Sequence, residues 1–433
     1  MPERLSSSVS SPSRTRARAA LLLVSALTAA VVGCTESFTG GDACPSLCPS
    51  RPAAYRDTTL DAVSLDTTLG GFPALGLSGS LLLANRPDTL VTRTVLRFDV
   101  LPTTFLPNKG TVSESITAVD SVFLVLPLDT TGRRGTGPVT IEAFDVDTTA
   151  NDSSQVVVRS LFRADRLFGS VTITPSTQGD TLRVPLLKDR MLAKVAANAR
   201  LRLGLRMTGG TGQVRVAAYL NGSASPTVTF DPSSDTTYAP LTVSPTTSLE
   251  SAPNDVNLAY LMYTLVDQGS SVPDAQTLVI GGFPSYRTYL RFNVPSSIVD
   301  SSTIVRAEVL LTQRPSSYAD NADSVAVLPI IPTASTAITD LRRILDLAAD
   351  GVFARLDSTR LVPRDSGQRA LNVLSLARAW PSQPLNVPRA VAFRISGEGA
   401  QSAELKFYST EAAPSLRPRL RITYLPRTET AIP

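Results

Sequence analysis

The residues best suited to chemistry in this 433-residue chain are arginines and tyrosines, because it contains no histidine. That composition excludes Ser-His-Asp and Cys-His catalysis and the common His-ligated zinc and haem sites. Arg287, Tyr289 and Arg291 are spaced two apart, so they share one face of a strand. Guanidinium groups fork carboxylates or sulfates and a tyrosine ring stacks on sugars, so this face is a candidate glycan-binding site. The alternative is structural arginines that pair with a carboxylate across the sheet or lie flat on a neighbour.

The other polar residues predict neither a catalytic nor a metal site. Carboxylate pairs such as Asp145 and Asp147 occur on every acidic surface, and nothing in the sequence distinguishes one carboxylate from another. Three aspartates near the starts of the predicted modules fit turn caps better than a calcium site, because no tight acidic loop is present. They are Asp57, Asp61 and Asp267. We expect no catalytic residue, metal or cofactor, with structural calcium as the alternative, and we expect the only tryptophan, Trp380, to be a core anchor.

The N-terminus has the pattern of an export signal. An arginine-rich leader precedes an apolar run from Ala19 to Val32, which is too short to span a bilayer comfortably. The run ends in Val31-Val32-Gly33-Cys34, which resembles the bacterial lipobox. This resemblance implies lipidation of Cys34 and stable anchoring by two or three acyl chains. Thr35, in place of the aspartate of inner-membrane retention, favours the outer membrane of a diderm bacterium; the alternative is an ordinary secretory signal with a chance cysteine.

Cys44 and Cys48 follow the leader at C-x-x-x-C spacing. In an exported protein this spacing predicts a local disulfide, because a metal site would need two further ligands. Removing the leader also takes four arginines and one glutamate from 41 basic and 37 acidic residues, which leaves a net charge near +1. A nearly neutral chain gives no reason to expect nucleic-acid binding. The expected partners are the membrane, through the lipid, and a cell-surface or environmental polysaccharide.

Recurring motifs divide the chain into two copies of one module. Residues 93–100 (RTVLRFDV) recur as residues 287–294 (RTYLRFNV), and residues 200–219 parallel residues 389–408. Gly70-Gly71-Phe72-Pro73 also recurs, as Gly281-Gly282-Phe283-Pro284. Aligning the two pairs of motifs leaves 17 extra residues, 74–90, in the first copy. We expect this apolar insertion to cover a sheet face or to dock a neighbour.

Period-two alternation within each copy predicts half-buried strands of an antiparallel sheet. Leu96 and Phe98, for example, alternate with Arg97 and Asp99. Many short strands, broken by turn residues that include 32 prolines and 25 glycines, indicate an all-β fold. We therefore predict two tandem antiparallel β-sandwich, jelly-roll-like domains after a lipoprotein signal peptide, with a Greek-key barrel as the alternative.

The predicted organisation has six parts, and chain order places the first module nearer the lipid. The parts are a signal peptide (1–33), a tether (34–52), sandwich module 1 (53–232), a linker (233–255), sandwich module 2 (256–426) and a tail (427–433).

The second module resembles the DNRLRE domain, a family that includes modules classed as carbohydrate-binding. The resemblance extends over nearly all of that module and rests on short segments, which include Ile304-Val305-Arg306-Ala307-Glu308-Val309 and Pro384-Leu385-Asn386 as well as four others. The four others are Tyr289-Leu290-Arg291-Phe292-Asn293, Leu371-Asn372-Val373 through Trp380, Phe407-Tyr408-Ser409-Thr410-Glu411 and Arg419-Leu420-Arg421-Ile422-Thr423-Tyr424. The first module keeps the Leu-Arg-Phe-Asp strand and lacks the tryptophan and the Ser-x-Glu. The resemblance implies a β-sandwich in secreted or cell-surface proteins, often as an accessory module, and does not imply an enzyme.

The sequence thus favours a non-enzymatic, lipid-anchored cell-envelope protein whose two modules bind glycan or serve structural or adhesive display. The alternative is a polysaccharide-processing lyase or hydrolase that uses carboxylates or a tyrosine on a sandwich face.

Overall fold

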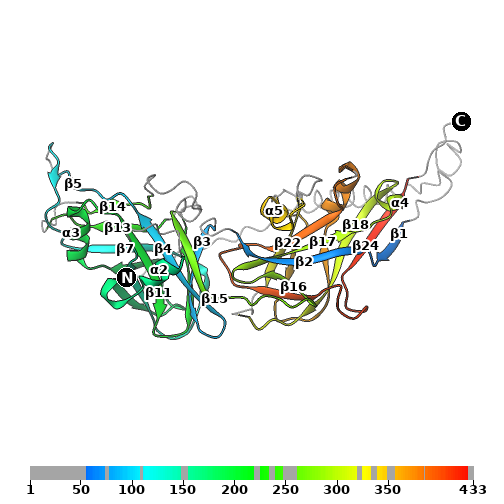
Figure 1. Ribbon diagram of the computed structural model, residues 1–433, viewed down its shortest axis with the longest axis horizontal. Coiled ribbons are helices and arrows are strands. Elements are labelled where there is room, and N and C mark those ends of the chain that lie inside the picture. Colours follow the sequence, from blue (N-terminus) through cyan, green and yellow to red (C-terminus); the bar gives the residue numbers. More distant parts are fainter. Residues whose placement is uncertain are drawn as a thin grey trace, which may run out of the picture. The chain divides into compact units, whose positions relative to one another are not determined.

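The computed structural model describes eleven stretches of the chain. They are residues 55–73, 78–107, 111–147, 155–218, 225–233, 239–246, 261–318, 324–332, 339–348, 356–384 and 386–427. The predicted signal peptide, Cys34, Cys44 and Cys48 lie outside these residues. Of the described residues, 50% lie in strands and 12% in helices, arranged as two antiparallel curled sheets (Figure 1). The all-β prediction and the prediction of two β-sandwich domains are confirmed.

The first curled sheet, which we call the N-terminal sandwich, consists of two four-stranded layers with added strands. One layer has the order β3 (Ser80–Arg86), β12 (Gly212–Ala217), β7 (Val122–Arg134), β10 (Thr181–Pro185). The other has the order β4 (Leu90–Phe98), β11 (Leu201–Thr208), β8 (Val139–Asp145), β9 (Leu167–Ile173). The added strands are β13 (Thr227–Phe230) on β7, β14 (Leu241–Val243) on β13 and β15 (Met262–Gln268) on β4.

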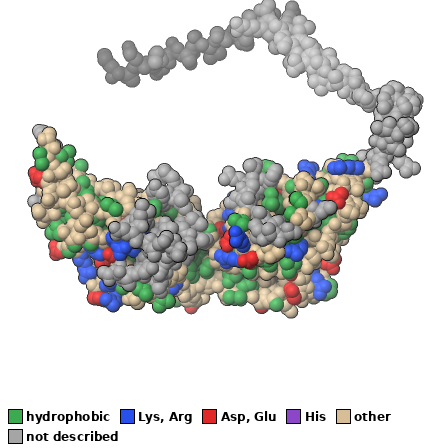
Figure 2. All heavy atoms as spheres, turned by 45° about the horizontal axis from the view of Figure 1, so that its top comes forward, with side chains coloured by type: hydrophobic (Ala, Val, Ile, Leu, Met, Phe, Trp, Pro, Cys, Tyr) green, Lys and Arg blue, Asp and Glu red, His purple; other side chains and the backbone are tan. Residues whose placement is uncertain are grey.

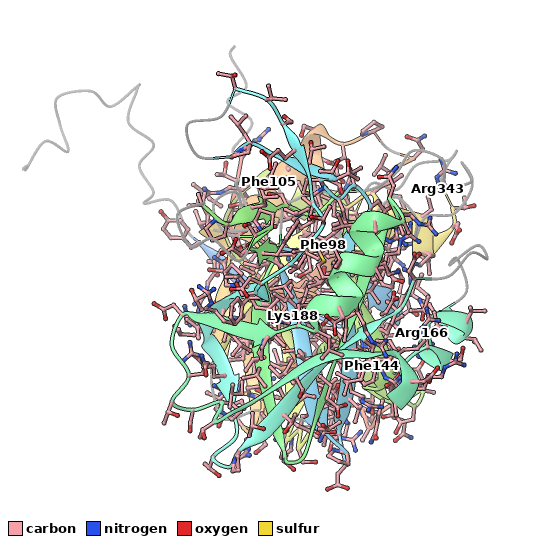
Figure 3. The ribbon with its side chains drawn as sticks, turned by 90° about the vertical axis from the view of Figure 1, so that its left-hand side faces the viewer. Phe98, Phe105, Phe144, Arg166, Lys188 and Arg343 are labelled. Atoms are coloured by element: carbon pink, nitrogen blue, oxygen red, sulfur yellow. The ribbon has the colours of Figure 1, made fainter. Side chains whose placement is uncertain are left out.

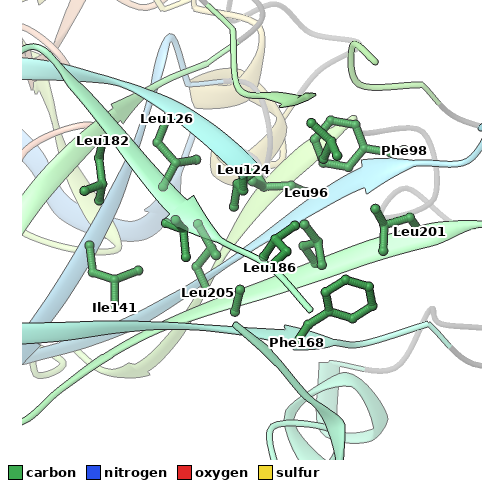
Figure 4. Close-up of a cluster of buried hydrophobic side chains, with 14 of the residues drawn as sticks. Leu96, Phe98, Leu124, Leu126, Ile141, Phe168, Leu182, Leu186, Leu201 and Leu205 are labelled. Atoms are coloured by element: carbon green, nitrogen blue, oxygen red, sulfur yellow. The ribbon is translucent and has the colours of Figure 1, made fainter. Parts of the chain in front are cut away.

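Alternating residues of the two layers meet in one hydrophobic core (Figure 4). Leu124, Leu126 and Leu182 come from one layer, and Leu96 and Phe98 come from the other; all five are buried. Figure 4 shows these side chains between the facing strands. The period-two pattern therefore identifies the core-facing residues, because a face of alternate apolar residues must pack against another such face.

The second curled sheet, the C-terminal sandwich, repeats this strand order. Its layers are β16 (Thr277–Gly281), β23 (Glu404–Tyr408), β18 (Ser302–Arg314), β21 (Gly367–Asn372), and β17 (Ser285–Phe292), β22 (Ala390–Ile395), β19 (Val325–Ile330), β20 (Thr359–Leu361). Numbering eight strands of each copy in chain order, strand 1 pairs with 8, 8 with 3 and 3 with 6, while 2 pairs with 7, 7 with 4 and 4 with 5. This is the double Greek-key order of a jelly roll in both copies. The strand that closes the second copy is β24 (Arg419–Pro426), which pairs with β18 as β13 pairs with β7.

The strands that complete the C-terminal sandwich come from the start of the described chain. Strand β1 (Arg56–Leu60) pairs with β24, and β2 (Val63–Phe72) pairs with β17. Figure 1 shows the blue β1 and β2 among the later strands of that sheet. Strands β14 and β15, which follow the first copy, take the corresponding positions on β13 and β4 of the N-terminal sandwich. The registers also correspond, because Thr68 faces Thr288 on β17 and Thr264 faces Thr94 on β4.

This pairing differs from the predicted boundaries. Residues 56–72, which the sequence assigns to module 1 (53–232), belong to the sheet of module 2. Residues 241–243 of the predicted linker (233–255) form β14, and residues 262–268 of module 2 (256–426) belong to the sheet of module 1. The repeat shows where a motif recurs. It does not show which sheet the strand before each copy joins, because that depends on which strand edges are open elsewhere in the chain.

The Gly-Gly-Phe-Pro recurrence does not mark equivalent positions, and the predicted insertion is wrong. The first copy of the motif ends β2, whereas the second lies at the turn between β16 and β17. Residues 74–90 contain the whole of β3, which occupies the same place in the jelly roll as β16. Leu81 and Leu83 fill the core of the N-terminal sandwich, while Leu82 on the other face packs against Phe283. The apolar run is therefore a regular strand buried on both faces.

Short helices cover the ends and one face of the sandwiches. They are α2 (Gln155–Ser160), η1 (Ala164–Arg166), α3 (Lys188–Ala196), α4 (Ser296–Val299), α5 (Leu341–Asp346), α7 (Leu374–Ala379) and η4 (Trp380–Ser382). Asp340 caps α5, since its side chain accepts a hydrogen bond from the amide of Arg342 at 2.9 Å. No helix in the described part of the chain has both the length and the apolar character of a membrane span.

Fragments cut according to strand pairing should fold better than fragments cut at the sequence repeat. Residues 78–268 hold every strand of the N-terminal sandwich, whereas residues 53–232 lack β14 and β15 and carry β1 and β2 without their partners. We expect a cooperative thermal transition, followed by circular dichroism, for 78–268 and a broad transition or aggregation for 53–232. A transition of 53–232 that is equally sharp and at least as high in temperature would contradict this assignment.

Candidate functional site: buried arginines and a polar cleft

The structure buries the predicted glycan-binding face of β17 instead of exposing it. Tyr289 is completely buried in a cluster that includes Phe72 of β2 and Ile344 and Leu345 of α5. The Arg291 guanidinium lies 5.9 Å from the ring centre of Tyr289, and its Nε is 3.4 Å from the tyrosine hydroxyl. A ring enclosed in this way has no face left on which a sugar could stack. The prediction missed this because a helix and a strand from distant parts of the chain cover the outer side of β17.

Arg287 is engaged by the protein itself. Its guanidinium pairs with the carboxylate of Glu398 at 2.5 Å, and its Nη1 donates to the carbonyl of Leu345 at 2.5 Å. The two side chains of this ion pair are 11% and 4% exposed. An external anion therefore cannot displace the carboxylate without breaking a buried ion pair. The structural interpretation of these arginines, pairing with a carboxylate or lying flat on a neighbour, describes Arg287 and Arg291.

The end of β2 is held by two guanidinium groups that lie over one aromatic ring. The Cζ atoms of Arg287 and Arg342 are 4.4 and 4.1 Å from the ring centre of Phe72, which is 2% exposed. Arg342 also donates hydrogen bonds to the carbonyls of Gly70 and Gly71. Arg287 is 11% exposed and Arg342 is 44% exposed. A desolvated cation–π contact contributes about 2 kcal/mol and an exposed one about 0.5–1 kcal/mol, so both contacts add to the backbone pairing of the strand and that of Arg287 adds more.

The N-terminal sandwich holds β15 by the same kind of contact, but toward the other end of the added strand. The buried Arg97 guanidinium lies 5.3 Å from the ring centre of Tyr263. Asp267 accepts hydrogen bonds from Arg93 at 2.6 Å and from Arg159 at 2.9 Å. Asp267 is therefore an anchor of an added strand. Asp57 of the same predicted set accepts a hydrogen bond from Thr423 across β1 and β24, and Asp61 is exposed.

One buried ion pair distinguishes the two sandwiches. Arg202 on β11 donates two parallel hydrogen bonds of 2.9 Å to Asp99, and the two side chains are only 1% and 0% exposed. By strand register the corresponding residues in the second copy are Ala390 and Asn293. The pair is fully enclosed by protein, so it serves the fold of the N-terminal sandwich rather than a ligand.

Asp145 and Asp147, an acid pair that nothing in the sequence distinguishes from others, are held in ion pairs in the fold. Lys194 of α3 lies 3.0 Å from Asp145 and 3.4 Å from Asp147, and Arg200 lies 3.0 Å from Asp147. Arg166 adds a hydrogen bond of 2.7 Å to the carbonyl of Asp145. Figure 3 labels Arg166, Phe144, which directly precedes Asp145 in the sequence, and Lys188, the first residue of α3. Both carboxylates are therefore engaged by cationic side chains of the protein itself.

A second polar cluster surrounds the turn between β16 and β17. Glu404, which is 1% exposed, accepts a hydrogen bond from Ser316 at 2.9 Å and pairs with Lys406 at 3.1 Å. The hydroxyl of Tyr318 donates to the carbonyl of Phe283 at 3.1 Å. Burial, with a contribution from Glu404, raises the pKa of Tyr318 far above its usual value. A tyrosine held in its neutral form cannot act as a base near pH 7, so this cluster supports the turn.

A polar cleft of about 560 Å³ is accessible to an external molecule. It is lined by Thr131, Gly132, Arg134, Gln213 and Arg215 of the N-terminal sandwich and by Ser324, Val325, Arg360, Ser396, Gly397, Ala400, Gln401, Ser402 and Ala403 of the C-terminal sandwich. The described lining residues include three arginines and neither a carboxylate nor an aromatic ring. Elsewhere, on the face shown in Figure 2, basic and acidic side chains are interspersed. An excess of one charge therefore makes this cleft distinct.

The arginines of the cleft differ in how far they are engaged. Arg215 pairs with Asp129 at 3.1 Å and donates to the hydroxyl of Thr131. Burial lowers the pKa of Arg215, and the charge of Arg134 lowers it further against the opposing effect of Asp129. Arg360 is exposed, and its one described contact is a weak one, with Ser324 at 3.4 Å. An anion that entered would relieve the repulsion between Arg134 and Arg215 and could reach Arg360 directly.

Gln213 shows that the cleft has an unused polar group. It is 6% exposed, and its amide nitrogen donates to the carbonyl of Gly132 at 3.1 Å. Its Oε1 is buried without a hydrogen-bond partner, and so is Nε of Arg215. A buried acceptor without a partner costs roughly 1–3 kcal/mol, which a hydroxyl donor from water or a ligand would recover. No sequence pattern marks this site, because its residues come from segments far apart in the chain.

Trp380 is the core anchor that the sequence predicts. It is completely buried, and its ring centre lies 6.0 Å from that of Phe292.

Among the described residues, no group of three or more Cys, Asp or Glu side chains lies close enough to hold a metal ion.

Replacing Phe72 with Ala should loosen the attachment of β2. The ring is buried beneath two guanidinium groups, so its removal should lower the free energy of unfolding by about 3–5 kcal/mol. Phe72→Leu keeps most of the apolar volume and should lose only the ring contacts, about half as much or less. Urea denaturation followed by circular dichroism measures both changes. A loss below about 0.5 kcal/mol for Phe72→Ala, typical of a surface position, would contradict the role of this contact.

Comparison with known proteins adds no family assignment. No family model matches the chain, and no curated protein matches it. The solved structures found include a mutant VP2 protein of infectious bursal disease virus in T=1 particles, at 9% identity over 87% of this chain and 74% of that one, with a TM-score of 0.11. A second match is the VP2 subviral particle of the same virus, at 9% identity over 87% of this chain and 77% of that one, also with a TM-score of 0.11. Similarity at this level supports no inference about this protein.

Proposed function

We propose that this protein is a non-enzymatic, lipid-anchored protein of the bacterial cell envelope whose paired jelly rolls bind an acidic polysaccharide. Export and anchoring are supported by the leader, the short apolar run and the cysteine at Cys34. The resemblance of the second module to the DNRLRE domain supports an accessory binding role. The proposed site is the polar cleft, in place of the buried face of β17.

The observation that carries the binding proposal is the arginine-rich lining of the cleft. Arg134, Arg215 and Arg360 line it together with serine, threonine and glutamine side chains and without a described carboxylate. Guanidinium groups bind the carboxylates of uronic acids, and hydroxyl and amide groups bind sugar hydroxyls. With no aromatic ring among the described lining residues, recognition depends on charge and hydrogen bonds rather than on stacking. Binding of this kind weakens as salt concentration rises.

The arrangement of the anchor follows from the pairing of β1. The segment after Cys34 leads directly into β1, which belongs to the C-terminal sandwich. The lipid therefore connects to the C-terminal sandwich, and the N-terminal sandwich becomes the farther one along the chain. This reverses the expectation from chain order, which placed the first module nearer the lipid.

The enzyme alternative has less support from the geometry. Acidic side chains that could act as a catalytic pair, such as Asp145, Asp147 and Glu398, are held in ion pairs with cationic partners. Tyr318 has a raised pKa, the opposite of what a tyrosine base requires. A binding role needs none of these groups to be free.

Arg360→Ala should weaken binding to acidic glycans. Loss of one charged hydrogen bond costs about 1.5–3 kcal/mol, so we expect at least about tenfold weaker binding of a polyuronate oligosaccharide by calorimetry. The control is Arg306→Ala, which removes an exposed arginine, paired with Glu308, that lies outside the cleft. Equal binding by both variants, or no binding of acidic glycans by the parent, would refute the cleft as a glycan site. Release of unsaturated or reducing ends from the glycan would instead support the enzyme.

Cys34→Ala should release the protein from membranes. Without the thiol no diacylglyceryl group can be attached, so the protein should move from the membrane pellet to the soluble fraction after cell lysis. Cys44→Ala, which leaves the lipidation site intact, is the matched control and should stay in the pellet. If Cys34→Ala still pellets as the parent does, the anchoring proposal fails.

A further inference from the structure

The C-terminal sandwich includes a segment that the ribosome synthesises before all the other strands of that sandwich. The N-terminal strand pair, which we define as β1 and β2 (residues 56–72), pairs with β24 and β17. Its partners begin at residue 285, so the N-terminal sandwich lies between the pair and its binding site in the chain. The N-terminal sandwich, by contrast, takes all its strands from the continuous segment 80–268.

The binding site for the strand pair is specific in sequence. Phe72 lies beneath the guanidinium groups of Arg287 and Arg342. Asp66 accepts hydrogen bonds from the amide and hydroxyl of Thr410, at 2.8 and 2.7 Å. The hydroxyl of Thr68 lies 3.2 Å from that of Thr288 and accepts a bond from the amide of Val279 at 3.1 Å. An arbitrary extended peptide would leave these groups unpaired, so the segment that fits is residues 56–72 of this chain.

We propose that the C-terminal sandwich also accepts the N-terminal strand pair of a second copy, so that two copies complete each other reciprocally. The contacts are the same whether the strand pair comes from its own chain or from another, so the two arrangements differ only in effective concentration. During synthesis the strand pair and the N-terminal sandwich are complete before β17 and β24 exist. The strand pair therefore stays unpaired until β17 and β24 are synthesised, and during that time the C-terminal sandwich of another copy can bind it.

Cysteine pairs across the strand contact test this directly. Asp57 and Thr423 face each other on β1 and β24, with their side chains hydrogen-bonded at 2.9 Å. Full-length chains with Cys34, Cys44 and Cys48 replaced by Ser carry either Asp57→Cys or Thr423→Cys. The two variants are mixed, unfolded in urea, refolded together and oxidised. A disulfide between positions 57 and 423 joins two chains in this mixture, and it exceeds the level of chance encounters only when the strand pair of one chain enters the sandwich of another.

Two controls make every result decisive. Thr140→Cys and Thr172→Cys chains, mixed in the same way, report on β8 and β9 of the continuous N-terminal sandwich, and this facing pair is as accessible as Asp57 and Thr423. We expect at least about fivefold more heterodimer, quantified by non-reducing electrophoresis and peptide mass, in the 57/423 mixture than in this control. A chain carrying both Asp57→Cys and Thr423→Cys should cross-link within itself. If it does and the mixture gives no more heterodimer than the control, the proposal is overturned; if it does not, the strand contact itself is absent and the proposal falls with it.

Discussion

The structure depends on how the exposed edge of each jelly roll is covered. Strands β4 and β17 each carry a row of backbone groups on the side away from their layer partners β11 and β22, and such an edge pairs readily with any extended chain. In both sandwiches a strand from outside the eight-stranded jelly roll covers it, in the same register. Once β15 and β2 occupy these edges, the paths that the chain takes between the two sandwiches are largely determined.

The two sandwiches solve the same problem with different side chains. In the C-terminal sandwich an aromatic residue of the added strand lies beneath arginines of β17 and α5. In the N-terminal sandwich the added strand contributes Tyr263 to Arg97 and Asp267 to Arg93 and Arg159. Three arginines of the Arg-Thr-x-Leu-Arg-Phe motif contact the added strand, and these are Arg93, Arg97 and Arg287. The fourth, Arg291, lies over Tyr289 of its own strand. A motif shared by two copies points in this protein to a shared structural task.

Local sequence predicted the elements well and their partners less well. The alternation around Phe98 and Phe292 identifies core-facing residues because it depends only on the geometry of a strand. The N-cap at Asp340 is equally local. The partner of β2 depends on which edge is open some 200 residues later, and no periodicity reports that. The burial of Tyr289 was missed for the same reason, since α5 and β2 arrive from other parts of the chain. The cleft could not be foreseen, because Arg134 and Arg360 become neighbours only when both sandwiches are formed.

Attachment of the N-terminal segment through β1 and β2 has a mechanical consequence for a protein held by its N-terminus. A pull on residue 55 reaches the N-terminal sandwich along the covalent chain through β2 and β3. It reaches the C-terminal sandwich first across the hydrogen bonds of β1 with β24 and of β2 with β17. Because these strands lie antiparallel along their partners, force along the strand direction loads many bonds at once instead of one after another. The strand pair would thus serve as a force-bearing joint, and its yield strength would set how much tension the C-terminal sandwich withstands before it opens.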